Sequence, residues 1–142
     1  MEPSELHPNF KIWLSKEKDK RKEKGNYVLG RGGAKLLEQI KKEKDLGKAA
    51  KKLKISYKKA WNILNKMKQN CDESPVVSHR GGKGGGGGIE LSELGSLLLK
   101  MYQKMRKFFE NAEIDFYNFV SSLNENKKKK KQCDRLNRNR NI

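Results

Sequence analysis

The sequence predicts a mainly α protein with a small β component, an α+β fold. Apolar residues recur at helical spacing over much of the chain, and short alternating stretches at 10–15, 26–30 and around 76–91 indicate strands. A third observation is a long apolar seam from about residue 93 to residue 124. With 142 residues, 34% of them hydrophobic, the chain can form one small core but not a second domain with its own ligand pocket.

Charge narrows the class of partner. Lys and Arg number 34 against 17 Asp and Glu, giving a net charge of +17. A surplus of this size predicts a polyanionic partner, nucleic acid rather than a membrane surface. No apolar run approaches the roughly 20 residues that span a bilayer, and the N-terminus has no signal-peptide core. We therefore expect a cytoplasmic, nucleoid-associated protein that binds no membrane.

Enzymatic and metal chemistry find little support. The two cysteines, Cys71 and Cys133, and the two histidines, His7 and His79, do not stand at metal-ligand spacing. We expect two free thiols. No carboxylate pair and no set of nucleophile and base is apparent. The sequence therefore predicts no enzyme activity, no cofactor and no metal.

The first element expected is a strand at 10–15, paired with a strand at 26–30 across a charged, mobile turn. A first helix should follow from about 33 to 44, where Leu36, Leu37 and Ile40 stand at helical spacing.

Two further helices follow, joined by residues 54–56. Ala49, Ala50 and Leu53 give a short helix with one apolar face, and Ser56 is a suitable N-cap for a helix to about residue 69. Two helices with so short a connection predict a helix-turn-helix. Lys54 stands where such turns often have glycine, and a left-handed backbone there would cost about 1 kcal/mol.

Residues 81–88 contain seven glycines, flanked by the candidate strands Val76–Ser78 and Ile89–Leu91. A Walker phosphate loop is excluded, because Lys83 is followed by Gly84 rather than by a hydroxyl residue. The glycines are better explained as the loop of a hairpin, since a loop without side chains can approach a sugar-phosphate backbone closely. The sequence thus predicts a wing beside the helix-turn-helix.

A long helix begins near Ser92, and its apolar side chains recur at spacings of three and four. It is longer than this small domain could cover, so we expect a homodimer. The alternative is a monomer whose helix folds back as two near Asn111. The residues expected at the dimer contact are Leu98, Met101, Met105, Phe108, Phe116 and Phe119.

The chain is expected to consist of four parts. Residues 1–9 form an N-terminal extension, 10–92 the winged helix-turn-helix domain, and 93–124 the long dimerisation helix. The last part, 125–142, is expected to be disordered, since residues 127–142 contain eight basic residues against one acid and almost nothing apolar.

The helix-turn-helix carries the nucleic-acid chemistry. Residues 46–71 contain eight lysines and no acid. A helical projection of 57–69 places Tyr57 and Trp61 on the apolar side, with Trp61 as a packing anchor rather than a stacking platform. Asn side chains on the polar face can bond adenine edges, and Lys can serve phosphates or guanine. The residues expected to contact DNA are Ser56, Tyr57, Lys58, Lys59, Asn62, Asn65, Lys66, His79, Arg80, Lys83, Gly84 and Gly85. The alternative is a lysine-rich helix that is plain solvated surface.

The stretches "ISYKKAWNILNKM" and "VVSHRGGKGGGGGIELSELGSLLLKMY", with "LGRGGAKLLEQI" before them, resemble the N-terminal DNA-binding domain of the ModE family. These are molybdenum-dependent transcriptional regulators related to the helix-turn-helix of LysR-type proteins. The resemblance, over about residues 11–102, implies a winged helix fold, homodimerisation and a palindromic operator. The chain stops in a lysine tail where molybdate-sensing members carry an oxyanion-binding domain, so we expect no molybdate binding.

The function expected is sequence-specific binding of double-stranded DNA by a dimeric winged helix-turn-helix regulator. Two alternatives remain. One is a chromatin-like architectural protein that coats DNA without sequence preference. The other is an RNA-binding or ribosome-associated protein, which would need an exposed aromatic platform.

Overall fold

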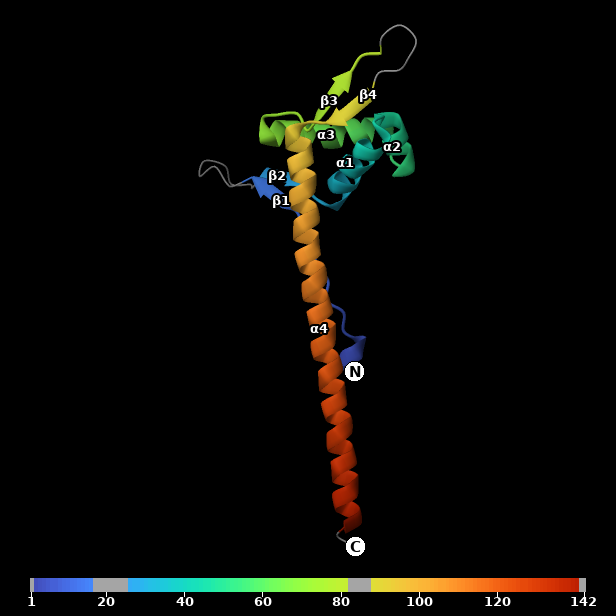
Figure 1. Ribbon diagram of the computed structural model, residues 1–142, viewed down its shortest axis with the longest axis vertical. Helices are drawn as coiled ribbons and strands as arrows, with labels where there is room; N and C mark the ends of the chain where they lie inside the picture. Colours follow the sequence, from blue (N-terminus) through green and yellow to red (C-terminus); the bar gives the residue numbers. More distant parts are fainter. Residues whose placement is uncertain (1, 17–25, 82–87, 141–142) are drawn as a thin grey trace. The chain divides into compact units, whose positions relative to one another are not determined.

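The computed structural model describes residues 2–16, 26–81 and 88–140 (Figure 1). Their contacts divide the chain into two compact units, Ile12–Arg106 and a unit formed by Met1–Lys11 with Lys107–Ile142. The helices are α1 (Arg31–Glu43), α2 (Leu46–Lys52), α3 (Tyr57–Cys71) and α4 (Glu93–Arg140), preceded by a short 3-10 turn, η1 (Pro3–Glu5). The strands are β1 (Leu14–Lys16), β2 (Asn26–Leu29), β3 (Val76–His79) and β4 (Gly88–Leu91). The predicted mainly α fold with a small β component is confirmed.

The core of the larger unit lies between α1, α2, α3 and the first turns of α4. Helix α1 contributes the side chains at helical spacing, Leu36, Leu37 and Ile40, all fully buried. Leu64 and Met67 of α3 meet them from the other side. This burial, rather than intrinsic helix propensity, accounts for the stability of such short helices.

Both two-stranded sheets are antiparallel hairpins. Strand β1 pairs with β2, with Leu14 opposite Leu29, and β3 pairs with β4, with Val76 opposite Leu91. The side chain of Asn70, near the end of α3, donates a hydrogen bond to the carbonyl of Tyr27 and ties the first hairpin to that helix. The strand predicted at 10–15 is displaced, because the β1 ladder begins only at Leu14.

Helix α4 differs from the prediction in two respects. It passes Asn111 without interruption, so the alternative of a helix folded back there is wrong. It also continues to Arg140, whereas residues 125–142 were expected to be disordered. The reason is that Lys, Arg, Glu and Gln are good helix formers, and extending an existing helix needs no new nucleation. Residues 141 and 142 lie outside the described part of the chain.

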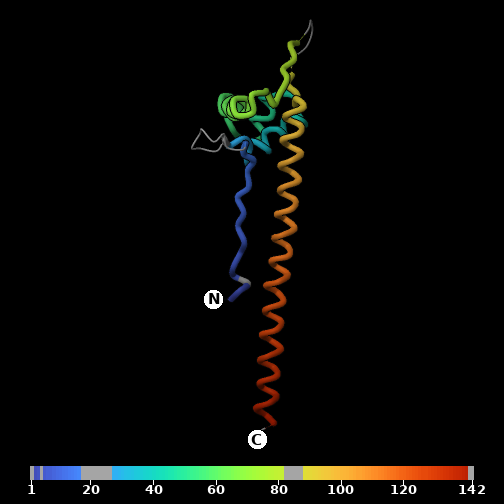
Figure 2. The backbone as a smooth tube through the Cα atoms, turned by 90° about the vertical axis from the view of Figure 1, so that its left-hand side faces the viewer, coloured from blue at the N-terminus to red at the C-terminus, as the bar shows by residue number. Residues whose placement is uncertain are grey.

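In the smaller unit, the N-terminal segment runs beside α4 (Figure 2). The ring of Phe10 lies against that of Phe109, with centroids 5.3 Å apart. Nδ1 of His7 lies 3.1 Å from the hydroxyl oxygen of Tyr117. Val120 is the buried apolar residue of this part of α4.

Candidate nucleic-acid interface

Helix α3 begins at a well-defined cap. The hydroxyl of Ser56 accepts a hydrogen bond from the Lys59 amide at 3.0 Å, as the sequence predicts for an N-cap. The preceding Lys54 has φ 56°, in the left-handed region. The turn between α2 and α3 therefore has the helix-turn-helix length and carries the backbone cost foreseen for a non-glycine residue.

The two faces of α3 separate as the projection indicates. Ala60, Leu64 and Met67 are buried, while Trp61 and Ile63 are half-buried against the core. Trp61 is thus a packing residue, as expected. The opposite face consists of exposed polar side chains, which are Lys58, Lys59, Asn62, Asn65, Lys66 and Gln69. We refer to these six residues as the α3 polar face.

Tyr57 departs from the projection. It was placed on the apolar side of the helix, but it is 55% exposed. Its ring meets that of Trp61 edge to face, with centroids 6.3 Å apart. As the first residue of α3, Tyr57 lies at the edge of the core. The helical projection does not take the end of the core into account.

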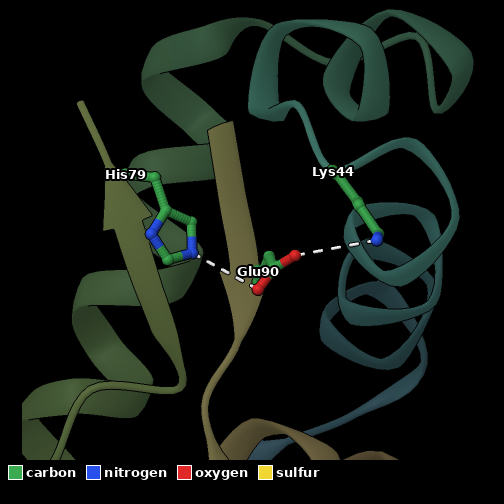
Figure 3. A network of polar contacts seen from close by, with 3 residues as sticks. All are labelled: Lys44, His79 and Glu90. Atoms are coloured by element: carbon green, nitrogen blue, oxygen red, sulfur yellow. Dashed lines mark hydrogen bonds and ion pairs between the residues drawn. The ribbon is translucent and has the colours of Figure 1, made fainter. Parts of the chain in front are cut away.

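The β3–β4 hairpin is fixed to the turn between α1 and α2. The amide of Ile89 donates a hydrogen bond of 3.0 Å to the carbonyl of Lys44. The carboxylate of Glu90 lies 3.7 Å from Nζ of Lys44 and 3.3 Å from Nε2 of His79 (Figure 3). These contacts set the position of the hairpin relative to the turn between α1 and α2.

His79 therefore has a partner within the protein. Its ring is turned across the sheet and contacts the carboxylate of Glu90 (Figure 3). Sequence reasoning missed Glu90 because no local pattern shows that residues 79 and 90 face each other. Only the hairpin register, with His79 opposite Gly88, brings them together.

A shallow hollow lies between the loop-side half of the β3–β4 hairpin and both helices of the motif. It is lined by Asp45, Leu46, Gly47, Tyr57, Trp61, Ser78, Gly88 and Ile89. The start of α2, the start of α3 and the loop-side ends of β3 and β4 thus meet at one place. Arg80 follows β3 and is exposed. Lys83, Gly84 and Gly85, the remaining expected contacts, lie outside the described residues.

Helix α2 adds exposed lysines to those of the α3 polar face. Lys48 and Lys51 are exposed, whereas Lys52 forms an ion pair with Glu43. The absence of acidic residues from 46–71 predicted a cationic surface. It could not show which of these lysines form ion pairs with acidic residues elsewhere in the chain.

The residues expected at a dimer contact fall into two groups. Leu98 is 7% exposed and belongs to the core of its own chain, so we remove it from the dimer contact. Its place on the seam gave no way to distinguish an internal from an external contact. Met105 is half-buried against the same core. Met101, Phe108, Phe116 and Phe119 are exposed, the two most exposed being Phe108 at 62% and Phe119 at 58%.

Two kinds of site are not found among the residues that the structure describes. No group of three His, Cys, Asp or Glu side chains could hold a metal ion. None of the described helices has a stretch long and apolar enough for a membrane span.

Comparison with known proteins gives partial matches to proteins named ModE. Over 77 residues, 54% of this chain, it is 35% identical to the molybdenum transport protein ModE of Azotobacter vinelandii and covers 28% of that protein. The match to the DNA-binding transcriptional dual regulator ModE of Escherichia coli (strain K12) is also 35% identical and covers 29% of that protein. The transcriptional regulator ModE of Yersinia pestis is 36% identical over the same length, again 29% of its chain. The match thus spans less than a third of each relative. No protein-family model matches the chain.

Proposed function

We propose that the protein is a sequence-specific, double-stranded DNA-binding transcriptional regulator that acts as a homodimer through a winged helix-turn-helix. The observation that carries the proposal is the α3 polar face, exposed and free of acidic residues, on a helix whose opposite face is buried in the core. The similarity to proteins named as ModE transcriptional regulators supports the same function.

The chemistry of the α3 polar face suits the major groove. Asn62 and Asn65 can each pair an amide with the N6 and N7 edge of adenine. Lys58 and Lys59, in the first turn of α3, suit the phosphates beside the groove, because contacts near the start of a recognition helix lie close to the backbone. In this proposal the lysines hold the helix on the DNA backbone, and the asparagines recognise the bases.

The β3–β4 hairpin serves as the wing. The loop-side ends of its strands lie at the starts of α2 and α3, where Ser78 and Gly88 line the shared hollow. Arg80 would bring a guanidinium to a phosphate there. In this proposal Lys83, Gly84 and Gly85 continue the contact along the sugar-phosphate backbone.

The exposed aromatic side chains of α4 support a homodimer. Phe108, Phe116 and Phe119 stand at spacings of eight and three residues, as on one side of a long helix. A second copy of the chain would bury them. Two recognition helices would then enter successive major grooves about 34 Å apart.

The architectural protein is the second candidate, because a net charge of +17 alone gives affinity for any duplex. Selection of bound fragments from a random duplex library separates the two. The proposal expects enrichment of an inverted repeat whose half-sites lie about one helical turn apart. A selected pool without consensus would instead support an architectural protein.

A further inference from the structure

We propose that the C-terminal end of α4, residues 127–140, is a second DNA-binding element that contacts duplex phosphates without reading sequence. It is separate from the α3 polar face and goes beyond the proposed regulator function. We refer to these residues as the basic segment.

The first support is the charge of the basic segment. It contains five consecutive lysines, Lys127–Lys131, and the arginines Arg135, Arg138 and Arg140. Asp134 is its one acid. The whole segment is exposed. Within the described residues, none of its lysines or arginines forms an ion pair. These cations are therefore available to an external anion.

The second support is the helical conformation, which arranges these cations. Lys127, Lys131, Arg135 and Arg138 follow at spacings of four, four and three residues within α4. Such spacings place side chains on one face of a helix. The row extends about 16 Å along the axis at 1.5 Å per residue. A row of this length can meet several phosphates of a duplex, since DNA carries one charge per about 1.7 Å.

The third support is a hollow on the same part of α4. Four lysines line it, Lys127, Lys128, Lys130 and Lys131, together with Asn124 and the carboxylates of Glu2 and Asp134. The hollow has twice as many cations as carboxylates. An anionic group that enters it would therefore meet a net positive site.

The chemistry of the segment favours duplex DNA over two other polyanions. A helix that lies on a membrane needs an apolar face, and here the apolar side chains are only Cys133 and Leu136. Single-stranded RNA is bound by proteins that offer aromatic stacking platforms, and residues 127–140 contain no aromatic residue. Contact with phosphates alone fits a duplex.

Like charges on neighbouring turns also point to an anionic partner. Lys127 and Lys131, and Lys131 and Arg135, are four residues apart, a spacing at which equal charges weaken a helix. Phosphates placed along this row would neutralise the repulsion. The bound form of the segment is thus the more stable helix.

The test uses the full-length protein and a fluorescent 30-bp duplex of random sequence, titrated between 50 and 200 mM KCl. The tail variant is Lys127→Gln/Lys131→Gln/Arg135→Gln, because glutamine removes charge but retains helix propensity. The control variant, Lys35→Gln/Lys41→Gln/Lys100→Gln, loses the same charge at exposed lysines of α1 and α4.

We expect the salt dependence of the tail variant to flatten by about 0.9 in slope for each lost phosphate contact, with at least tenfold weaker binding at 100 mM salt. The control variant should keep the wild-type slope. The variant Lys127→Arg/Lys131→Arg should also keep it, which separates loss of charge from loss of folding. Equal slopes for tail and control variants would overturn the proposal. Loss of RNA binding with unchanged duplex binding would also overturn it.

Failure of this proposal can be distinguished from failure of the proposed function. The tail variant should also weaken binding when it is combined with Lys58→Ala/Lys59→Ala, because the two elements are independent. An effect that disappears in this background would mean that the basic segment acts only through α3, which contradicts a separate site.

Discussion

Gly95 and Pro75 are in backbone contact: a Cβ at Gly95 would lie 2.0 Å from the carbonyl oxygen of Pro75. The same oxygen accepts a hydrogen bond of 2.9 Å from the amide of Ser92. The hydroxyl of Ser92 in turn donates to the carbonyl of Ser74 at 2.6 Å. The first turn of α4 is thus joined to the segment that leads into β3, and both ends of the hairpin are held.

Gly95→Ala should therefore destabilise the protein. The methyl group meets backbone, which cannot rotate away, and overpacking of this kind costs about 1–3 kcal/mol. Urea unfolding followed by circular dichroism measures the change. Gly32→Ala in α1 is the matched control, because nothing lies within 4 Å of its added Cβ. It should leave the free energy of unfolding equal or slightly higher, and equal stability of the two variants would refute the contact.

Lys54→Gly should stabilise the protein by about 1 kcal/mol, since a left-handed backbone disfavours residues that carry a Cβ. The φ of Lys54 is 56°. Thermal and urea unfolding provide the measurement. Lys51→Gly, one turn earlier and inside α2, also removes an exposed lysine but should destabilise by about 0.5–1 kcal/mol. If both variants were destabilised alike, the turn would not be left-handed.

Local sequence signals predicted most of the fold. The N-cap at Ser56, the apolar spacing of Leu36, Leu37 and Ile40, and the alternation around Val76 each depend on near neighbours in the chain. They gave the right helices and hairpins, because short-range sterics and one buried face determine such elements.

What the sequence did not give depends on contacts between distant residues. Leu98 was expected at a dimer contact but is buried in the core of its own chain. The apolar spacing along a helix is the same whether a residue packs inside its own chain or against a second copy. Tyr57 was placed on the apolar side of its helix, because a helical projection does not show where along the helix the core ends. The pairing of His79 with Glu90 follows from strand register alone. The helix at 125–140 continues a stable α4, so that its good helix formers need no new nucleation.

The two thiols should differ in reactivity. Burial raises the pKa of Cys71; the charge of Lys16 opposes this rise, and those of Asp72 and Glu73 add to it. Less thiolate is therefore present at pH 8 than in an ordinary thiol, and Cys133 is in addition exposed. Labelling with iodoacetamide, followed by peptide mass spectrometry, should modify Cys133 first. As the pH rises, labelling of Cys71 should catch up. Faster labelling of Cys71 at pH 8 would contradict its placement against the core.

Lys58→Ala/Lys59→Ala should weaken binding to every duplex, because these lysines are expected to contact phosphates. The slope of log K against log salt should flatten by about 0.9 for each lost contact. Fluorescence anisotropy at several salt concentrations measures this slope. Lys35→Ala/Lys41→Ala, which removes two exposed lysines of α1, should retain it. An unchanged slope in the α3 variant would mean that Lys58 and Lys59 contact no phosphate.

The most direct test of base reading by the α3 polar face is the affinity of Asn62→Ala for the selected operator relative to random duplex. We predict that this ratio falls by the equivalent of about 1–3 kcal/mol, while binding to random DNA stays near wild type. Gln103→Ala, which truncates an exposed amide on α4, should keep the full ratio. An equal loss of affinity for operator and random DNA, or no loss for either, would contradict base reading by α3.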